Sequence, residues 1–136
     1  MDLDKAREFI RTNHRAVLAT RRQGGEIQQS PVLVTVDAEG RLVVSSRDAA
    51  YKTSNLRRDP WAQVCVLTNK FFGDWVLVQG DVEVVEFPDS VESLVDYYRR
   101  TVGEHPDWDE YRESMHRERR VLLRLHPRTA GPDRHR

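Results

Sequence analysis

The stretch Tyr51-Lys-Thr-Ser-Asn-Leu-Arg-Arg-Asp-Pro60 combines one lysine, hydroxyl and amide side chains, two arginines and a closing Asp-Pro step. We expect a helix here, with Asp48 as its N-cap and Arg58 as its last residue. The helix should end at Asp59, because a residue that precedes proline avoids helical backbone angles. The stretch therefore predicts a short polar helix between two runs of β-branched residues.

The residues around this helix are rich in groups that bind anions: Ser45, Ser46 and Arg47 before it, and Lys52 and Asn55 within it. Backbone N–H groups at a strand end and at a helix N-terminus can hold a phosphate when a lysine lies beside them. A solvated helix face is the alternative interpretation. Composition alone does not separate the two.

Apolar and β-branched segments on both sides of the helix predict an antiparallel sheet. Turn segments that contain glycine separate them at hairpin spacing, at 23–26 and 37–40. Gly80, near the middle of the longest segment, predicts a bulge or a sharp bend of the kind found in closing barrels. About six strands are expected, at 16–20, 27–36, 41–46, 63–68, 75–86 and 121–125.

Three further helices are expected, at 3–13, 89–102 and about 107–119. Gly103 stands where a helix C-terminal cap belongs. The predicted fold class is mostly β: a β-barrel with peripheral helices, in a single domain over residues 1–136. Its core is expected at about 14–125, with a flexible tail over 127–136.

Composition excludes several functional classes. Lys and Arg total 22 and so do Asp and Glu, so the net charge gives no support for general binding to nucleic acid or to an anionic membrane. The single cysteine, Cys65, lies in an apolar run, and the five histidines lack metal-ligand spacing, so we expect no disulfide and no metal site. With neither a secretory signal nor a membrane span expected, we predict a cytoplasmic protein.

Several motifs, taken in order, resemble the pyridoxamine-phosphate-oxidase-like split-barrel family. The stretch 51–60 is similar to its K-x-x-N-L-x-x-D-P signature, and Trp75-Val-Leu-Val-Gln-Gly80 is similar to its W-x-x-x-x-G strand. The segments 16–20 and 28–32 match its opening hairpin. The segments 103–112 and 119–123 resemble a narrower group, the actinobacterial deazaflavin-dependent branch, which uses coenzyme F420.

This resemblance implies an FMN-binding split barrel that forms a homodimer with two cofactor sites at its interface. Lys52 would bind the cofactor phosphate, and Asn55 would brace the helix that presents it. Relatives often carry an arginine two residues before the lysine, where this chain has Ala50. Arg47 would reach the same anion from the preceding turn.

The resemblance also implies which residues surround the cofactor ring and ribityl chain. Trp75 would come from the other subunit, or would close the pocket from the barrel wall. Together with Val32 and Val44, it would supply a flat apolar wall for a tricyclic ring. The remaining polar and apolar contacts would come from two strands: Gln28, Ser30, Val32, Ser45 and Ser46.

The activity implied is an F420-dependent reductase that transfers a hydride to an unsaturated small-molecule substrate, with aromatic and histidine residues of 97–116 as a roof. F420 carries a polyglutamate tail, which would favour a basic groove formed by Arg21, Arg22, Arg47, Arg57 and Arg58. Two alternatives stay open: an FMN-dependent oxidase or reductase of the pyridoxamine-phosphate-oxidase type, and a non-catalytic flavin- or haem-binding protein. The sequence specifies neither the substrate nor a proton donor.

Overall fold

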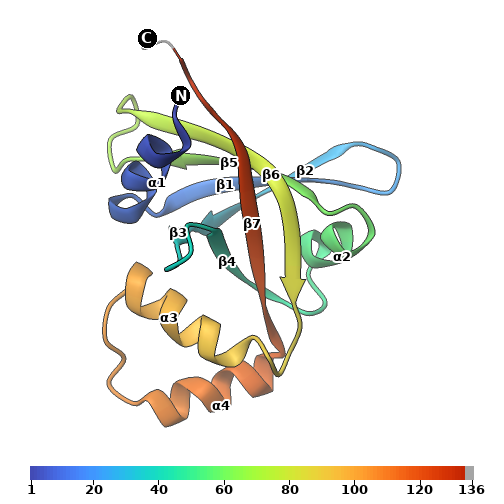
Figure 1. The fold of residues 1–136 in the computed structure, drawn as a ribbon. Coiled ribbons are helices and arrows are strands. Elements are labelled where there is room, and N and C mark those ends of the chain that lie inside the picture. The colour runs from blue at the N-terminus through green and yellow to red at the C-terminus, as the bar shows by residue number, and fades with distance from the viewer. Residues whose placement is uncertain (134–136) are drawn as a thin grey trace.

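A computed structural model describes residues 1–133 as one curled antiparallel sheet with helices around it (Figure 1). The strands lie in the order β2-β1-β5-β6-β7-β4-β3. The mostly β class and the peripheral helices are therefore confirmed. The elements are α1 (Leu3–Thr12), β1 (Arg15–Arg21), β2 (Ile27–Leu33), β3 (Thr35–Val36), β4 (Leu42–Arg47), α2 (Tyr51–Arg58), β5 (Trp61–Leu67), β6 (Trp75–Val85), α3 (Val91–Thr101), α4 (Trp108–Glu118) and β7 (Arg120–Gly131).

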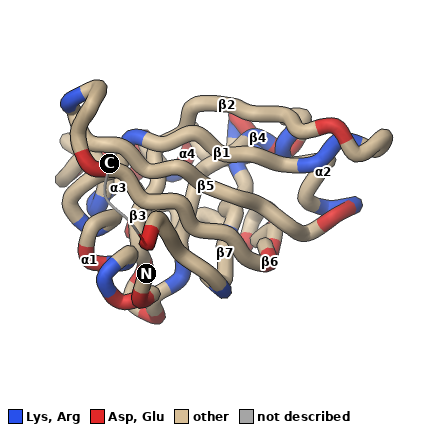
Figure 2. The backbone as a smooth tube through the Cα atoms, turned by 90° about the horizontal axis from the view of Figure 1, so that it is seen from above, with Lys and Arg blue, Asp and Glu red and all other residues tan. Residues whose placement is uncertain are grey.

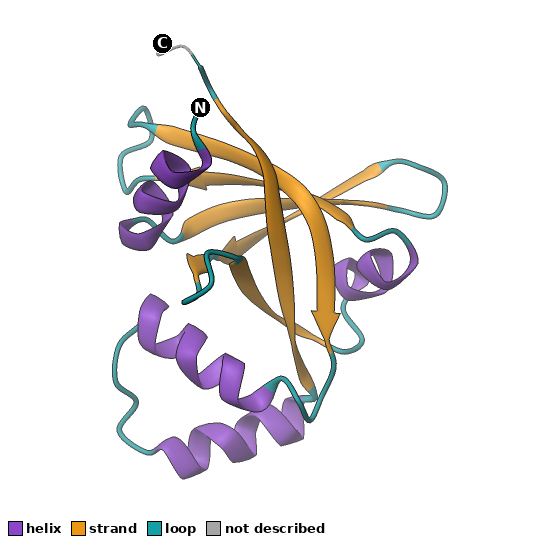
Figure 3. Ribbon diagram, in the orientation of Figure 1, coloured by secondary structure: helices purple, strands orange, loops and turns teal. Residues whose placement is uncertain are grey.

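The described residues form seven strands rather than the predicted six, because the segment expected as one strand over 27–36 is divided. β2 pairs with β1, whereas β3 pairs with β4 at the other end of the sheet. Between them, the backbone N–H of Val34 donates to the carbonyl of His14 at 2.8 Å. The chain thus crosses from one sheet edge to the other, which curls the sheet into a half-barrel (Figure 3).

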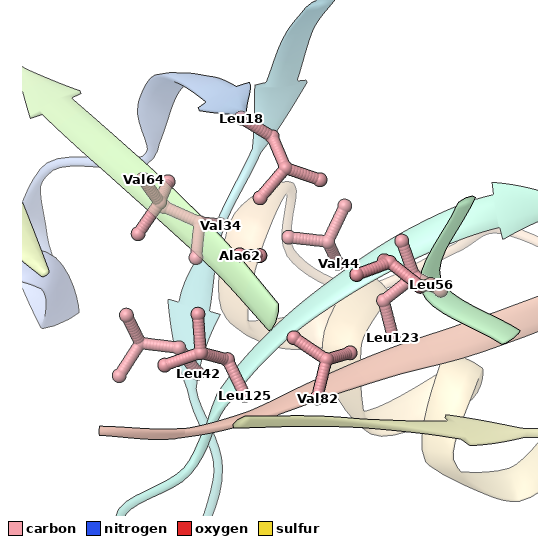
Figure 4. Close-up of a pocket in the computed structure, with 10 residues that line it drawn as sticks. All are labelled: Leu18, Val34, Leu42, Val44, Leu56, Ala62, Val64, Val82, Leu123 and Leu125. Atoms are coloured by element: carbon pink, nitrogen blue, oxygen red, sulfur yellow. The ribbon is translucent and has the colours of Figure 1, made fainter. Parts of the chain in front are cut away.

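The concave side of the sheet holds the main core, because alternate residues of each strand point to the same face. Figure 4 shows these side chains converging on a nearly filled interior, about 10 Å³ of which stays open. Val44 belongs to this buried group, so the expectation that it forms part of a wall for the cofactor ring is wrong. The core side chains in the figure are Leu18, Val34, Leu42, Val44, Leu56, Ala62, Val64, Val82, Leu123 and Leu125.

Gly80 lies at a bulge in the pairing of β6 with β7, as predicted. Gln79 faces Thr129 and Gly80 faces Pro127, so the extra residue of the bulge, Arg128, belongs to β7. A Cβ atom on Gly80 would lie 2.0 Å from the carbonyl oxygen of His126, so a side chain has no space there. Proline is tolerated at such a bulge because it has no N–H to donate to the ladder.

The last strand is longer than expected. β7 continues to Gly131 and pairs with the first half of β6, so the predicted strand end at 125 and the loose tail from 127 are wrong over 127–131. The expected flexibility of 134–136 lies outside the described residues.

α3 and α4 form a second, smaller core on the convex side of β4 and β7. Val43 and Leu122 of these strands pack against Leu94 and Val95 of α3 and Met115 of α4. The predicted C-terminal cap of α3 is confirmed: Gly103 has φ +120° and its N–H donates to the Tyr98 carbonyl at 3.1 Å.

Charged residues lie on the helices, in the hairpin turns and along β6 and β7, whereas the central parts of β1 and β5 carry none (Figure 2). Among the described residues, no helix is both long enough and apolar enough to cross a membrane.

Candidate functional site

The first turn of α2 is fixed to the end of β4 by a chain of hydroxyl groups. Thr53 Oγ1 donates to the carbonyl oxygen of Arg47 at 2.7 Å. Ser46 Oγ lies 2.7 Å from Thr53 Oγ1 and must be the donor there, since Thr53 has only one hydroxyl hydrogen. Ser46 is 1% exposed. The structure therefore places Ser46 beneath α2, where it positions the helix.

α2 begins at Tyr51, three residues after the predicted cap. The N-cap position is Ala50, and no side chain hydrogen-bonds to the first turn. Asp48, the expected cap, instead forms an ion pair with Arg57 at 2.5 Å. The first N–H groups of α2 thus have no side-chain acceptor among residues 1–133, and this leaves them available to an anion.

Asn55 ties α2 to the first two strands. Its amide nitrogen donates to Gln28 Oε1 at 2.9 Å and to Thr20 Oγ1 at 3.1 Å, and the side chain is buried. Gln28 therefore has its amide oxygen toward Asn55, and the amide nitrogen of Gln28 points away from Asn55. The helix that carries Lys52 is therefore fixed from both β4 and β2.

Replacing Asn55 by alanine should lower the free energy of unfolding by about 1–3 kcal/mol, because buried polar groups would lose their partners. Denaturant unfolding followed by circular dichroism measures this. Asn69→Ala, in the exposed β5–β6 turn, is the matched control and should unfold like the wild type. Equal stability of the two variants would contradict the bracing role of Asn55.

A cavity of about 340 Å³ lies between the β1–β2 hairpin and α2, lined by Arg22, Gln28, Tyr51 and Asn55. Tyr51 stands at its rim with 80% of its surface exposed. Gln28 and Asn55 are predicted site residues, whereas Tyr51 is not among those predicted from the sequence. Its only signal was its place directly before Lys52 in the motif.

The charge of Lys52 lies within electrostatic range of Arg120, the first residue of β7. Partial burial lowers the pKa of Lys52 below its usual value of 10.5, and the charge of Arg120 lowers this pKa further. Arg120 is the register partner of Arg47 across the β4–β7 pair. Arg120 is not among the predicted site residues, although it lies in the segment 119–123 that resembles the deazaflavin branch.

The depressed pKa of Lys52 predicts a pH dependence of stability. Between this pKa and 10.5, the folded chain binds fewer protons at Lys52 than the unfolded chain, so stability rises with pH across that window. A Lys52→Met variant should lack this rise, and Lys70→Met, in an exposed loop, should keep it. Urea unfolding of the three proteins from pH 7 to 10 measures the difference; identical profiles for all three would contradict the prediction.

Ser45 points to the opposite face of β4 from Ser46, toward α3. There the hydroxyl of Tyr97 donates to the Leu33 carbonyl at 2.8 Å and lies close to the Ser45 backbone. Burial raises the pKa of Tyr97, while the Ser45 contact and the charge of Arg120 oppose this rise. Tyr97 thus bridges β2 and β4, which do not pair directly.

The other predicted ring contacts are divided between two ends of the sheet. Ser30 and Val32 lie half-exposed on the same face of β2 as Gln28. Trp75 lies at the far end of β6, opposite Leu67 in the register, about 20 Å along the strands from the α2 end. The structure therefore does not bring Trp75 together with Lys52 within one chain.

The five arginines expected to form an open basic groove are mostly paired with acids or with the backbone. Arg21 pairs with Asp59 and stacks on Trp61, and Arg58 bonds to the backbone of Arg21. The remaining ion pairs are Arg47–Glu118, Arg57–Asp48 and Arg57–Glu86. The expected groove of free cations does not form among the described residues.

The expected aromatic roof is also packed internally. Four rings contact one another between α3 and α4, with centroid separations from 4.9 to 5.8 Å. These rings are Tyr98, His105, Trp108 and Tyr111. Tyr97 alone among the predicted tyrosines contacts the β2–β4 gap in the described part of the chain.

Comparison with solved structures supports this fold. The conserved hypothetical protein Rv2991 from Mycobacterium tuberculosis is similar over 96% of this chain and 82% of its own, with 22% identity and a TM-score of 0.77. An F420 reductase is similar over 91% of this chain and 94% of its own, with 18% identity and a TM-score of 0.71. A pyridoxamine 5'-phosphate oxidase-related, FMN binding protein from Nostoc punctiforme covers 93% of this chain and 75% of its own, with 15% identity and a TM-score of 0.61.

The family assignment comes from the sequence as a whole. The family model described as pyridoxamine 5'-phosphate oxidase matches residues 3–131, nearly the full chain. The match includes the motif of α2 and the whole of β6 and β7. With a half-barrel, the α2 motif and this match in agreement, the chain belongs to the pyridoxamine 5'-phosphate oxidase family.

Proposed function

We propose that this protein is an oxidoreductase that binds coenzyme F420 and reduces an unsaturated small molecule. The observation that carries the proposal is the first turn of α2, where Lys52 and N–H groups without a side-chain cap lie beside a cavity lined by Gln28 and Tyr51. A phosphorylated cofactor with a planar ring needs both features: a cation with N–H donors for the phosphate, and a neighbouring cavity for the ring. When bound, such a cofactor supplies hydride transfer, and the protein supplies orientation.

The residues of this chain would act mainly by binding and positioning. Lys52 and the uncapped N–H groups of α2 would hold the phosphate. The Gln28 amide nitrogen, which has no hydrogen-bond partner among residues 1–133, would donate to a polar ring edge. Tyr51 would stack on a ring face, and Ser30 and Val32 would line the ring from β2.

FMN is the second candidate cofactor, and a specific observation favours it. Four of the five arginines expected to hold a polyglutamate tail are paired within the chain, and FMN has no such tail. The similar F420 reductase supports F420, and the similar FMN binding protein supports FMN. A flavin or deazaflavin oxidoreductase covers both.

We further propose a homodimer that completes the site. The convex face of β2, β1 and β5 carries a cross-strand row formed by Pro31, Val17 and Cys65, and Leu33 and Leu67 beside it are 40% and 36% exposed. An apolar face of this kind suits an isologous contact with a second copy. Such a contact would let Trp75 of one subunit approach the α2 end of the other. Leu67→Asp should then produce monomers in light scattering and weaken cofactor binding.

Turnover tests the proposed function. The protein is mixed anaerobically with reduced F420, or with reduced FMN, and a panel of conjugated ketones and quinones, while oxidation of the cofactor is followed by absorbance. Oxidation that is faster than without protein, and lost in Lys52→Met, supports the oxidoreductase. Tight binding with no acceleration for any acceptor would favour a cofactor-storage protein. The cofactor whose oxidation the protein accelerates more strongly is the natural cofactor.

A further inference from the structure

The corner between α4 and β7 is held against the turn between β4 and α2. Arg119 forms this corner with left-handed backbone angles, φ 49° and ψ 54°, which residues other than glycine rarely adopt. Its carbonyl accepts a 3.0 Å hydrogen bond from the backbone N–H of Asp48. The two residues that flank Arg119, Glu118 and Arg120, are thereby placed next to the anion-binding end of α2.

Two guanidinium groups converge there on one carboxylate oxygen. Arg120 donates to Glu118 Oε1 from Nε at 3.2 Å and from Nη2 at 3.0 Å. Arg47 donates to the same oxygen from Nη2 at 3.3 Å. Within the described chain, Oε2 of Glu118 has no hydrogen-bond partner. Three N–H groups directed at a single oxygen resemble the way arginines bind a phosphate oxygen.

Two arginines bind this single carboxylate, and the charge of a nearby lysine acts on one of them. Arg47 and Arg120 are register partners, the Thr53 hydroxyl fixes α2 to the Arg47 carbonyl, and Lys52 of α2 lies within electrostatic range of Arg120. The side chains of Arg120 and Glu118 are 25% and 34% exposed, so they are partly desolvated but open to a small ligand. The cluster of Arg47, Lys52, Glu118 and Arg120 keeps an excess of positive charge that an anion would neutralise.

We propose that Arg120 is a second phosphate-binding residue and that Glu118 is an internal counter-ion, which occupies the place of a phosphate oxygen until a phosphate monoester displaces it. The identity of the monoester as a cofactor rests on the function proposed above. The binding of an anion by the cluster does not depend on that proposed function. Glu118 holds the two guanidinium groups in position before binding, and competes with the ligand for them.

Inorganic phosphate is the direct probe, because it carries the charge without the ring. Its binding is followed by NMR shifts of backbone amides at constant ionic strength. Glu118→Gln keeps the shape but removes the competing charge, and should tighten phosphate binding about fivefold or more. Arg120→Gln should weaken it about tenfold, and Arg120→Lys should recover part of the loss. The matched controls, Glu110→Gln on α4 and Arg128→Gln on β7, should bind like the wild type.

The outcomes separate this inference from the proposed function. Unchanged or weaker phosphate binding in a folded Glu118→Gln protein would overturn the counter-ion role, and wild-type binding in Arg120→Gln would overturn the role of Arg120. Titrations with FMN and F420 are made in parallel. If phosphate responds as expected but neither cofactor binds, the cluster stands and the proposed function fails. If the cofactors bind equally well in all variants, the proposed function stands and this inference fails.

Discussion

Replacing Gly80 by alanine should destabilise the protein by about 3 kcal/mol or more. The new Cβ would lie 2.0 Å from the His126 carbonyl oxygen and 3.2 Å from the Pro127 Cα, and both are backbone atoms of the paired strand. Neither can move without breaking the β6–β7 ladder, which supports both the barrel wall and the start of β7. For a chain of this size, the melting temperature should fall by about 10 °C.

Gly131→Ala is the matched control for this experiment. A Cβ on Gly131 meets no atom within 4 Å, although the residue lies on the same strand pair. Calorimetric unfolding of the two variants should therefore differ strongly. If the melting temperature of Gly80→Ala lies within about one or two degrees of that of Gly131→Ala, β6 and β7 do not approach each other closely at the bulge.

Replacing Lys52 by methionine should weaken binding of a phosphorylated cofactor by about 10- to 100-fold, because a charge-assisted hydrogen bond contributes about 1.5–3 kcal/mol. Stability at neutral pH should not fall in the same variant. Burial and the charge of Arg120 both lower the pKa of Lys52, so the charged lysine is unfavourable in the unliganded fold. Loss of binding together with retained or increased stability is the signature of a residue kept for its ligand.

Riboflavin, which lacks the phosphate, provides the internal control for Lys52→Met. Isothermal titration should give the same riboflavin affinity in the variant and the wild type, while FMN affinity differs. A parallel loss for both ligands would show that the substitution damages the cavity rather than the phosphate contact. Lys70→Met tests whether removal of any lysine charge has the same effect.

Much of the fold follows from local sequence signals. The bulge at Gly80 and the cap at Gly103 were predicted because each needs a residue without a Cβ. The division of 27–36 into β2 and β3 was missed, since the run is locally continuous and only the Val34–His14 hydrogen bond shows the crossing. The end of β7 is not predicted because proline usually interrupts a strand, yet Pro127 is tolerated in β7 since it lies at the bulge.

The candidate site was less predictable, because its contacts join distant segments. Gln28 and Asn55 were named from the motif, and the structure brings them into hydrogen-bond contact. Arg120 was missed, since its proximity to Lys52 depends on the pairing of β4 with β7. The basic groove was overpredicted, because the sequence does not show that Arg21 and Arg57 lie against acids.

The most direct test of the proposed cofactor site is an equilibrium titration of the full chain with F420, FMN and riboflavin, followed by quenching of tryptophan fluorescence. We predict that F420 or FMN binds tightly, that riboflavin binds more weakly, and that Lys52→Met removes the difference between FMN and riboflavin. A wild-type protein that binds none of the three, or that binds riboflavin as tightly as FMN, would contradict a phosphate site at the start of α2.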